Sequence, residues 1–402
     1  MCDPVWQAGD PVWQAGRDVD RGIILSRPLA GPQSLLRTLN GRAVLESLAR
    51  SGAQTRTELM AATGLSRTAV TQVIRMLDSA GAIAAAGVDR DTRGPAAGRV
   101  KLHPRLGFAA AVHIDHHAAH VALVDATGAV RAEQHAAFPA GEDRVAHIAA
   151  LIDGCRPANA PVHLVVVGVP GIVTPDGGIR DDLGPDGGAF RGTLGATLDC
   201  PVRVENDVNL AALAELTAGV GGEFASFALL VLDDALGAGI VLDGALHRGF
   251  SGVAGEVMYL PQTPLPIGAP IVNEAVVGDL ALGLGLDVDA PLLTHLEAAG
   301  RGDEAAGRLV AEVAKRIVLV AGSVGLVLDP EAFVLGGDAA HPVLRDAIER
   351  YAESLAAQLP LRFVASSFGP EAPLVGAIGE AASTLRAALF TRILTPSAGT
   401  GR

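Results

Sequence analysis

Two short blocks of sequence decide the fold, Val204-Glu205-Asn206-Asp207-Val208-Asn209 and Gly252-Val253-Ala254-Gly255-Glu256. Around them, apolar runs typical of strands alternate with Ala-rich stretches of helical periodicity. The expected strands are residues 107–114, 121–124, 164–169, 227–232, 239–242 and 333–335. The expected helices are residues 143–153, 209–218, 304–328 and 341–359, with another after Pro373. This alternation predicts an α/β body that begins after Pro104.

The preceding segment, residues 34–104, has the pattern of a winged helix-turn-helix domain. Its first helix has apolar residues at three-to-four spacing and ends at Gly52: Leu35, Leu39, Val44, Leu45 and Leu48. Thr55 or Thr57 can cap a second helix, Gly64 makes the turn, and Ser66 can cap a third. The third helix is expected to bury Val70, Val73, Ile74 and Leu77. Residues 83–102 then form a hairpin wing with a Gly/Pro/Arg-rich tip.

The outer face of the third helix carries side chains suited to reading a DNA groove. The candidates on and before this helix are Ser66, Arg67, Thr68, Thr71, Gln72 and Arg75. Arg93 and Arg99 of the wing are expected to reach phosphates or the minor groove. The alternative is a structural helical hairpin with ordinary surface charge.

Charge is distributed in a way that favours this reading. The 402-residue chain has a net charge of −13, but residues 34–104 contain ten basic and five acidic residues. Their net charge of +5 leaves −18 for the remainder. Such asymmetry is typical of a small nucleic-acid-binding module on an acidic body. A chain of this length suits two or three domains.

Membrane, secreted and disulfide-rich classes are excluded by composition. No segment offers eighteen uninterrupted apolar residues, and the N-terminus lacks the pattern of a signal peptide, so a cytoplasmic protein is expected. The three cysteines are widely separated and form no CxxC pair. Residues 1–33 contain a tandem repeat, DPVWQAG at 3–9 and again at 10–16, and are expected to be a disordered leader without a role.

Several motifs in order along the chain resemble the ROK family of bacterial sugar kinases and sugar-responsive repressors. Besides the two opening blocks they are Gly168-Val169-Pro170-Gly171, Asp243-Gly244-Ala245-Leu246-His247-Arg248-Gly249, Leu335-Gly336-Gly337 and Val375-Gly376-Ala377. The resemblance implies a two-lobed, actin-like ATPase fold with a cleft between the lobes. The expected lobes are residues 105–220 and 221–390, and residues 391–402 are an expected tail.

The same resemblance implies a sugar site. In the family's kinases the Asp of the first block is the general base, and the position here is Asp207. Asn206 and Glu256 match residues that bind other sugar hydroxyls, a role for which amides and carboxylates are suited. Gly171, Tyr259 and Glu274 are further candidates at this site. The alternative is that these acidic groups cap helix amides.

The phosphate-binding loops depart from the family pattern. The first reads Asp115-His116-His117-Ala118-Ala119 where the family has Asp-x-Gly-Gly-Thr. The second reads Asp233-Asp234-Ala235 where the family has Gly-Thr-Gly. Lost glycines close the approach to phosphate oxygens, and two carboxylates repel a polyphosphate. We therefore expect a pseudokinase without cofactor, in which Asp207 is a relic base.

The family's zinc site is also missing. Tyr259 replaces its His, and its cysteine positions fall on Leu265, Ile267 and Val272, which cannot bind zinc. His113, His116, His117 and His120 lie on an expected hairpin, where alternation prevents all four from converging. No metal site is expected.

The sequence thus predicts a transcription repressor, a homodimer or homotetramer that binds a palindromic double-stranded DNA operator and responds to a sugar or sugar derivative. Two alternatives stay open. One is an active ATP-dependent sugar kinase with an appended DNA-binding domain, and the other is a DNA-binding protein whose sensor is a ligand-free oligomerisation scaffold.

Overall fold

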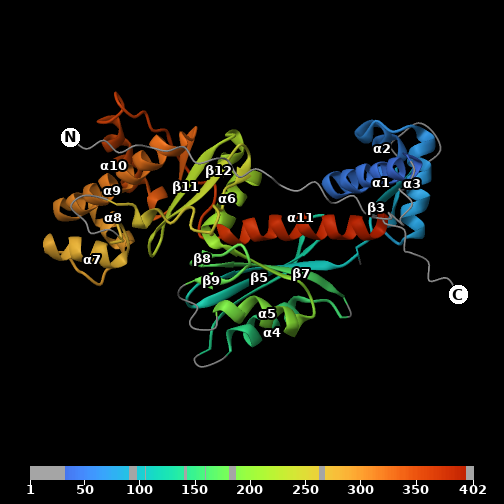
Figure 1. Ribbon diagram of the computed structural model, residues 1–402, viewed down its shortest axis with the longest axis horizontal. Coiled ribbons are helices and arrows are strands. Elements are labelled where there is room, and N and C mark those ends of the chain that lie inside the picture. Colours follow the sequence, from blue (N-terminus) through green and yellow to red (C-terminus); the bar gives the residue numbers. More distant parts are fainter. Residues whose placement is uncertain are drawn as a thin grey trace, which may run out of the picture.

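The computed structural model describes residues 32–89, 97–104, 106–139, 143–158, 160–180, 187–261 and 268–394. The expected leader, Arg93 at the wing tip, and Leu265 and Ile267 lie outside the described residues. Three bodies follow one another along the molecule, a small N-terminal domain and two lobes (Figure 1). Each lobe is built on a five-stranded sheet. The α/β, two-lobed architecture expected from the sequence is confirmed.

The N-terminal domain has the winged helix-turn-helix arrangement. Helices α1 (Pro32–Ser51), α2 (Arg56–Thr63) and α3 (Arg67–Ser79) precede strands β2 (Ile83–Asp89) and β3 (Ala97–Leu102), and β1 (Gln54–Thr55) completes a sheet of order β1-β3-β2. Of the two candidate caps for α2 it is Thr55 that acts, in a reciprocal capping box with Glu58. Gly64 makes the turn in the left-handed region, with φ 69°.

The first lobe is a mixed sheet covered on both faces. Its order is β10-β7-β4-β5-β6, in which β4 (Phe108–Ile114), β7 (Val162–Val169) and β10 (Val202–Asn206) run parallel. Strands β5 (Ala118–Asp125) and β6 (Val130–Ala137) add antiparallel neighbours. Helices α4 (Arg144–Cys155) and α5 (Gly187–Leu198) cover one face, below the sheet in Figure 1. A hairpin of β8 (Ile172–Val173) and β9 (Ile179–Arg180) follows β7.

The second lobe repeats this plan with a sheet of order β13-β12-β11-β14-β15. Its strands are β11 (Phe227–Leu232), β12 (Leu236–Leu242), β13 (Ala245–Leu246), β14 (Ala332–Gly337) and β15 (Phe363–Ala365). Its outer helices are α7 (Glu274–Gly283), α8 (Leu292–Gly300), α9 (Glu304–Leu328) and α10 (Pro342–Glu353). They bury a large aliphatic core against one face of the sheet.

Two helices join the lobes. Helix α6 (Asp207–Ala218) leaves the first sheet at β10 and packs against β12 of the second. Helix α11 (Ala372–Leu394) follows the second lobe in sequence, yet packs on α6 and on strands β4 and β7 of the first lobe. The expected boundary of a second lobe at residues 221–390 is therefore wrong for this last helix. The expected tail at 391–402 likewise begins within it, because α11 continues to Leu394.

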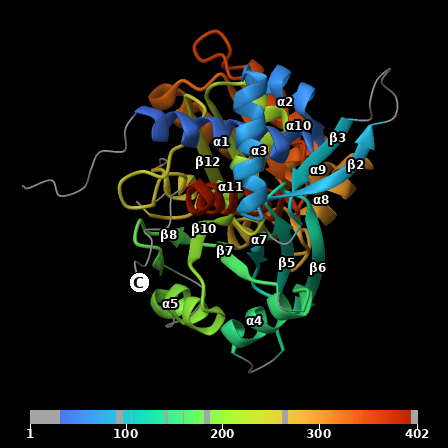
Figure 2. The same cartoon turned by 90° about the vertical axis from the view of Figure 1, so that its right-hand side faces the viewer.

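The N-terminal domain packs on helix α11. One continuous apolar cluster contains Val44 and Leu48 of α1, Ala109 of the first sheet, and Leu385 and Phe390 of α11. Figure 2, which looks along α11, shows this helix between the winged domain and the sheet of the first lobe. The winged domain thus packs on the first lobe through apolar side chains. Burial of apolar surface is the dominant favourable contribution to the free energy of such a contact.

Sequence periodicity mis-assigned some faces and ends. Leu39 was expected to be inward on α1, but it is 54% exposed. The expected helix 341–359 ends at Glu353, where α10 gives way to turns. Strand β6, helix α5 and helices α7 and α8 were not predicted. Among the described residues, none of the helices combines the length and apolar character that crossing a membrane requires.

The packing of α11 on α6 gives a test of this architecture. A Cβ at Gly376 would collide with the backbone carbonyl oxygen of Leu210 on α6, whereas a Cβ at Gly379 would meet nothing within 4 Å. We expect Gly376→Ala to lower the free energy of unfolding by about 1–3 kcal/mol, because two backbones must separate. Gly379→Ala, the matched control, is expected to be neutral or to stabilise by up to about 1 kcal/mol. Urea unfolding measures both, and equal effects would contradict the packing.

Candidate functional site

The junction of β10 and α6 brings three of the expected sugar-site residues together. Asn206 caps α6, since its Oδ1 accepts a hydrogen bond of 2.9 Å from the backbone N–H of Asn209. Its Nδ2 donates to the carbonyl of Gly171 at 3.2 Å and to Oδ1 of Asp207 at 3.1 Å. Gly171 lies between β7 and β8 with φ 90°, a conformation that favours glycine. Asn206 therefore caps α6, a role that was held open only for the acidic groups of this site.

Asp207 is the first residue of α6 and is partly buried. Its Oδ1 accepts a hydrogen bond of 2.7 Å from the backbone N–H of Val208. Burial raises the pKa of its carboxyl to about 7, and the nearby charges of Asp233 and Glu256 act in the same direction. Near neutral pH this group can therefore either donate or accept a hydrogen bond, as a partner for a hydroxyl requires.

The other three candidates lie on the second lobe. Glu256 directly precedes the short 3-10 helix η2 (Val257–Tyr259), and it faces Asp207 closely enough to influence its titration. Gly255 before it has φ 104°, and a Cβ there would collide with the carbonyl of Ala238. Tyr259 is 46% exposed at the end of η2. Glu274 begins α7, and its backbone N–H donates to the carbonyl of Asp234. Glu274 therefore lies beside the second phosphate loop.

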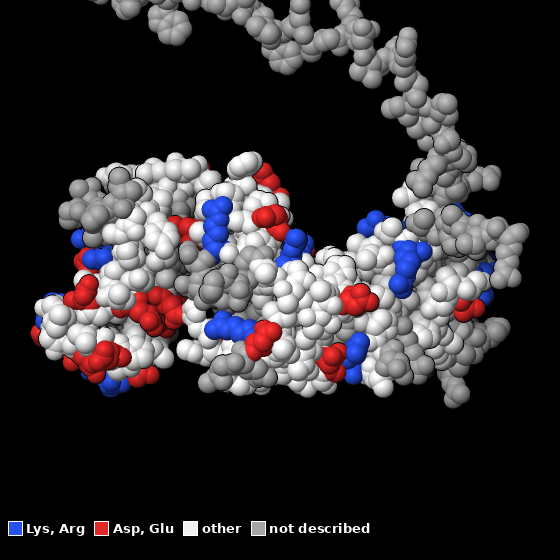
Figure 3. All heavy atoms as spheres, turned by 60° about the horizontal axis from the view of Figure 1, so that its bottom comes forward, with Lys and Arg blue, Asp and Glu red and all other residues white. Residues whose placement is uncertain are grey.

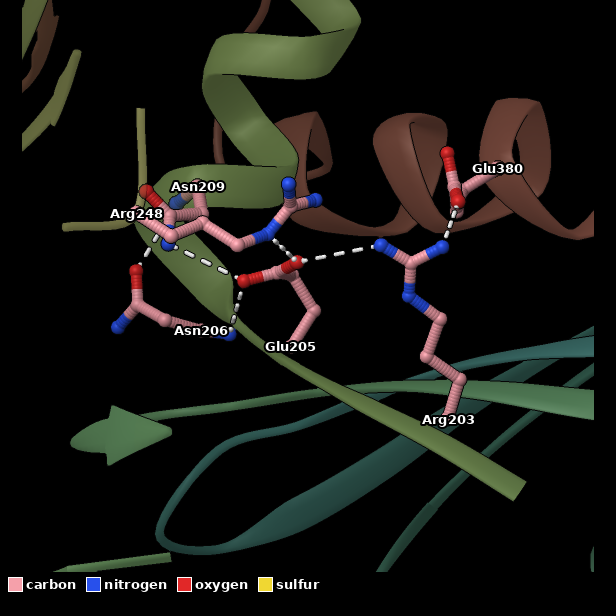
Figure 4. Close-up of polar contacts among 6 residues, drawn as sticks. All are labelled: Arg203, Glu205, Asn206, Asn209, Arg248 and Glu380. Atoms are coloured by element: carbon pink, nitrogen blue, oxygen red, sulfur yellow. Dashed lines mark hydrogen bonds and ion pairs between the residues drawn. The ribbon is translucent and has the colours of Figure 1, made fainter. Parts of the chain in front are cut away.

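A buried carboxylate that sequence reasoning did not single out joins the lobes. Glu205 is 4% exposed at the end of β10. Its Oε2 lies 2.6 Å from Nε of Arg248, in the loop that follows β13. Its Oε1 accepts from Nδ2 of Asn209 at 3.1 Å and from the backbone N–H of Asn206 at 3.3 Å (Figure 4). A carboxylate removed from water needs this degree of pairing.

Arg203 extends the same network. Its guanidinium lies 3.8 Å from Oε2 of Glu205 and also forms an ion pair with Glu380 of α11 (Figure 4). The network thus runs from α11 through β10 to the loop of the second lobe. Glu205 and Arg248 both lie in motifs quoted from the sequence. Their pairing could not be predicted from those motifs, because the two residues are 43 positions apart.

The two expected phosphate loops face each other across the lobes. Oδ1 of Asp115 accepts hydrogen bonds of 2.7 Å from the backbone N–H groups of His117 and Ala118, which closes the β4–β5 turn on itself. Nε2 of His116 lies 3.6 Å from Oδ2 of Asp234 on the β11–β12 turn. The backbone N–H groups and side chains of the two loops that would bind a phosphate therefore already contact other groups of these loops.

The surrounding charge does not suit a nucleotide. Burial raises the pKa of Asp233, and the charges of Asp338 and Asp234 raise it further. Three carboxylates thus meet where the family's fold would hold a polyphosphate, and they would repel it. The residues present do not fit ATP.

The residues at the family's zinc positions do not fit a metal either. Val272 is fully buried among apolar side chains of the second lobe, and Tyr259 offers a phenol in place of an imidazole. Among the described residues no group of three or more His, Cys, Asp or Glu side chains is arranged to hold a metal ion. His113 and His120 lie opposite each other on the paired strands β4 and β5, whereas His116 contacts Asp234 of the second lobe.

The expected DNA-reading side chains share one face of α3. Arg67, Thr68, Gln72 and Arg75 are exposed, while Val70, Val73, Ile74 and Leu77 are buried as expected. The Ser66 hydroxyl caps the helix by accepting from the backbone N–H of Ala69. The Thr71 hydroxyl donates to the carbonyl of Arg67. These last two hydroxyls are therefore already engaged within the helix.

Arg99 does not lie free on the wing as expected. Its guanidinium donates to the carbonyl of Ala53 at 3.0 Å and forms an ion pair of 3.2 Å with Glu58 of α2. It lies on β3 beside the short strand β1, at the base of the hairpin. Arg99 thus links the wing to α2, and its expected role as a DNA contact stays a prediction.

The raised pKa of Asp207 predicts a pH-dependent stability. In the unfolded chain this carboxyl loses its proton at about pH 4, whereas the folded chain keeps it up to about pH 7. The folded state therefore binds more protons in this window, and the Asp207 contribution to the free energy of unfolding falls as pH rises from about 4 to 7. Asp207→Asn abolishes this fall. We expect the variant to gain stability relative to the wild type across the window, with no further gain above it.

Urea unfolding at several pH values measures this difference directly. The prediction concerns the slope with pH, so a constant offset from lost or altered hydrogen bonds does not affect it. A difference between variant and wild type that is independent of pH would contradict the raised pKa.

Comparison with known proteins agrees with the geometry. Residues 109–266 match the model of the ROK family. The xylose repressor of Caldicellulosiruptor bescii is 25% identical over 237 residues, which are 56% of this chain and 59% of that protein. The match therefore spans less than two thirds of that repressor.

Solved structures share the fold. The crystal structure of a ROK family transcriptional regulator, described as a homolog of the E. coli MLC protein, has a TM-score of 0.66 at 21% identity. It covers 89% of this chain and 99% of its own. A ROK family glucokinase from Streptomyces griseus, in complex with glucose and AMPPNP, has a TM-score of 0.56 at 23% identity and covers 69% of this chain and 100% of its own. This chain carries a ROK family domain.

Proposed function

We propose that this protein is a sugar-responsive transcription regulator that binds duplex DNA through its winged domain and acts as a repressor. The observation that carries the proposal is the exposed polar face of α3, with Arg67, Thr68, Gln72 and Arg75 on a helix whose opposite face is buried. A recognition helix of this kind enters the major groove and reads base edges with its N-terminal residues. The name of the xylose repressor relative supports the same function.

The position of α3 suits this role. It lies at the end of the molecule opposite the second lobe (Figure 1). Acidic side chains gather over the second lobe on the face shown in Figure 3. Negative charge repels DNA phosphates, so the acidic end would be held away from the duplex while the winged end approaches it.

The apolar seat on α11 supports a route from ligand to DNA. Because α1 and α11 share one buried cluster with the first lobe, a rotation of the lobes would carry the winged domain with it. In a homodimer or homotetramer, such a rotation changes the spacing of two winged domains, and a palindromic operator fixes that spacing. A ligand with different affinity for the two lobe arrangements would then shift DNA binding.

The ligand proposed is a sugar or sugar derivative bound by Gly171, Asn206, Asp207 and Glu256. Three of these are linked by hydrogen bonds, and Glu256 approaches Asp207 from the second lobe. Residues from both lobes would therefore contact one ligand. Tyr259 and Glu274 border the same region and are assigned to it with the others.

Operator binding tests the proposal. The full chain is used to select binding sites from random duplex DNA, and affinities for the selected site are measured by fluorescence anisotropy at fixed salt. We expect Arg67→Ala and Gln72→Ala each to weaken specific binding by about 1–3 kcal/mol, roughly 5-fold to 150-fold, because base-edge contacts are lost. Arg308→Ala, which removes an exposed charge on α9, is the matched control and is expected to bind as the wild type does.

Two results would contradict the function. One is that no sequence is enriched from random DNA. The other is that the α3 variants bind the selected site as tightly as Arg308→Ala does. If no carbohydrate alters the affinity for the operator, the result would instead favour the hypothesis that the two-lobed body is a ligand-free oligomerisation scaffold.

A second candidate, an active sugar kinase, is favoured by one observation. Asp207 occupies the position of the family's general base, and its pKa of about 7 suits proton abstraction at neutral pH. The acidic second phosphate loop and the His116–Asp234 contact oppose it. A coupled assay of ADP release, run with a panel of sugars, separates the two functions. ADP release that Asp207→Asn abolishes would establish the kinase. No ADP release is expected if the protein is a regulator without kinase activity.

A further inference from the structure

The outer face of helix α9 changes character halfway along the helix. In the N-terminal half this face carries charged side chains, among them Glu304, Arg308 and Lys315, which are exposed. Glu312 on the same face forms a surface ion pair with Lys315, with Oε2 and Nζ 3.8 Å apart. Such a face is typical of a helix whose outer side meets water.

The C-terminal half of α9 has an apolar outer face instead. Residues 317–328 include no charged residue. Leu319 is 38% exposed, Leu326 is 77% exposed and Val327 is 80% exposed, and the exposed Ser323 lies among them at a spacing of three or four residues. These four residues share one side of the helix and are called the α9 stripe below. A helix that is apolar all round is normally covered on every side.

The other sides of this half are covered within the chain. Its inner side belongs to the aliphatic core of the second lobe. The segment after α10 covers a further side, since a Cβ at Gly322 would lie 3.0 Å from Cδ2 of Leu359, and a Cβ at Gly325 would lie 3.2 Å from Cδ2 of Leu361. Among the residues that the structure describes, the α9 stripe is therefore the side of this half that stays in contact with water.

The α9 stripe is suited to burial at its centre as well. The Ser323 hydroxyl donates to the carbonyl of Leu319 at 2.9 Å, so its proton needs no acceptor from outside the helix. Covering this hydroxyl with apolar surface therefore leaves no donor without a partner. Ser323 is also small and lies between larger side chains, an alternation that lets two surfaces interdigitate.

We propose that a second copy of this chain covers the α9 stripe, with the two α9 helices antiparallel about a two-fold axis close to Ser323. This axis brings Leu319 of each copy onto Leu326 and Val327 of the other, so large side chains meet on both sides of the two serines. A two-fold contact requires a surface that is complementary to itself. The order large, small, large along the α9 stripe meets that requirement.

Charge complementarity favours a second copy over an unrelated partner. Lys315 and Asp329, both exposed, flank the α9 stripe at its two ends. They lie about 12 Å and about 9 Å from Ser323 along the helix axis, at a rise of 1.5 Å per residue. Antiparallel packing therefore places Lys315 of each copy close to Asp329 of the other, twice by symmetry. Parallel packing would place Lys315 beside Lys315, which is unfavourable.

The interface would lie away from the other proposed sites. Helix α3 is at the end of the molecule opposite the second lobe (Figure 1). The candidate sugar-binding residues lie on other elements than α9. The proposal therefore goes beyond the proposed function: it names a contact for a homodimer, and it depends on neither DNA nor sugar binding.

Analytical ultracentrifugation of the full chain over a range of concentrations tests the proposal. We expect the wild type to self-associate, and we expect Leu326→Lys to raise the dissociation constant by roughly 100-fold, because two-fold symmetry buries the new charge twice. Leu282→Lys is the matched control, since it adds the same charge at a leucine of α7 that is 68% exposed, and it is expected to associate as the wild type does. Thermal unfolding of both variants shows whether they remain folded.

Charge reversal tests the antiparallel orientation. We expect Lys315→Glu to weaken association by about three- to tenfold, because each new carboxylate meets Asp329 of the other copy. Adding Asp329→Asn is expected to relieve this loss, and Asn tolerates the left-handed conformation of this position, with φ 47°. Arg308→Glu is the control, because Arg308 lies on the same face but farther from Ser323 than the other copy's α9 extends.

Three results would overturn the interface. They are a full chain that is monomeric at every concentration, association that Leu326→Lys leaves within twofold of the wild type, and a Lys315→Glu defect that Asp329→Asn does not relieve. The proposed function stands or falls separately. A chain that associates through the α9 stripe but selects no DNA sequence would keep the interface and contradict the regulator. Operator selection by a chain whose association ignores Leu326→Lys would do the reverse.

Discussion

The ion pair of Glu205 with Arg248 is the contact on which the arrangement of the lobes depends. A carboxylate that is 4% exposed pays a large desolvation cost and needs partners on both oxygens. Arg248 from the second lobe, and the amides of Asn206 and Asn209 from the first, supply them. Separating the lobes at this point would leave the buried carboxylate with Arg203, at 3.8 Å, in place of the closer guanidinium of Arg248. The same carboxylate accepts from the amides of Asn206 and Asn209 at the start of α6, where two of the candidate sugar-binding residues lie.

A second constraint connects this junction to the DNA-binding end. Arg203 links Glu205 to Glu380 on α11, and the far end of α11 holds the winged domain by apolar packing. Ion pairs therefore lie in the N-terminal half of α11, and apolar packing holds the winged domain at its C-terminal end. Because packed elements move as units between discrete arrangements, this helix is the physical route by which a change between the lobes would reach α3.

Local signals in the sequence predicted much of the fold. Strand β11 and helix α9 have the bounds that the sequence indicated, since an uninterrupted apolar run and a helical repeat after the Asp303 cap need no distant partner. The capping of α3 by Ser66 and the turn at Gly64 were equally local. The family motifs placed Gly171, Asn206 and Asp207 at one expected site, and the side chain of Asn206 donates hydrogen bonds to both of the others.

What could not be predicted depends on contacts between distant residues. Nothing near Arg99 in sequence indicates Glu58, 41 residues away, as its partner. Periodicity gave Leu39 the same face as Val44, but only the position of neighbouring elements decides which turns of α1 are covered. The return of α11 to the first lobe likewise follows from tertiary packing alone.

A double-mutant cycle tests most directly whether the ion pair of Glu205 and Arg248 holds the lobes together. The free energy of unfolding is measured for the wild type, Glu205→Gln, Arg248→Gln and the double variant. We expect the two substitutions to be coupled by about 1–3 kcal/mol, because Glu205→Gln removes the buried charge and Arg248→Gln removes its partner. A coupling energy near zero, with the two effects simply additive, would show that this pair does not hold the lobes together.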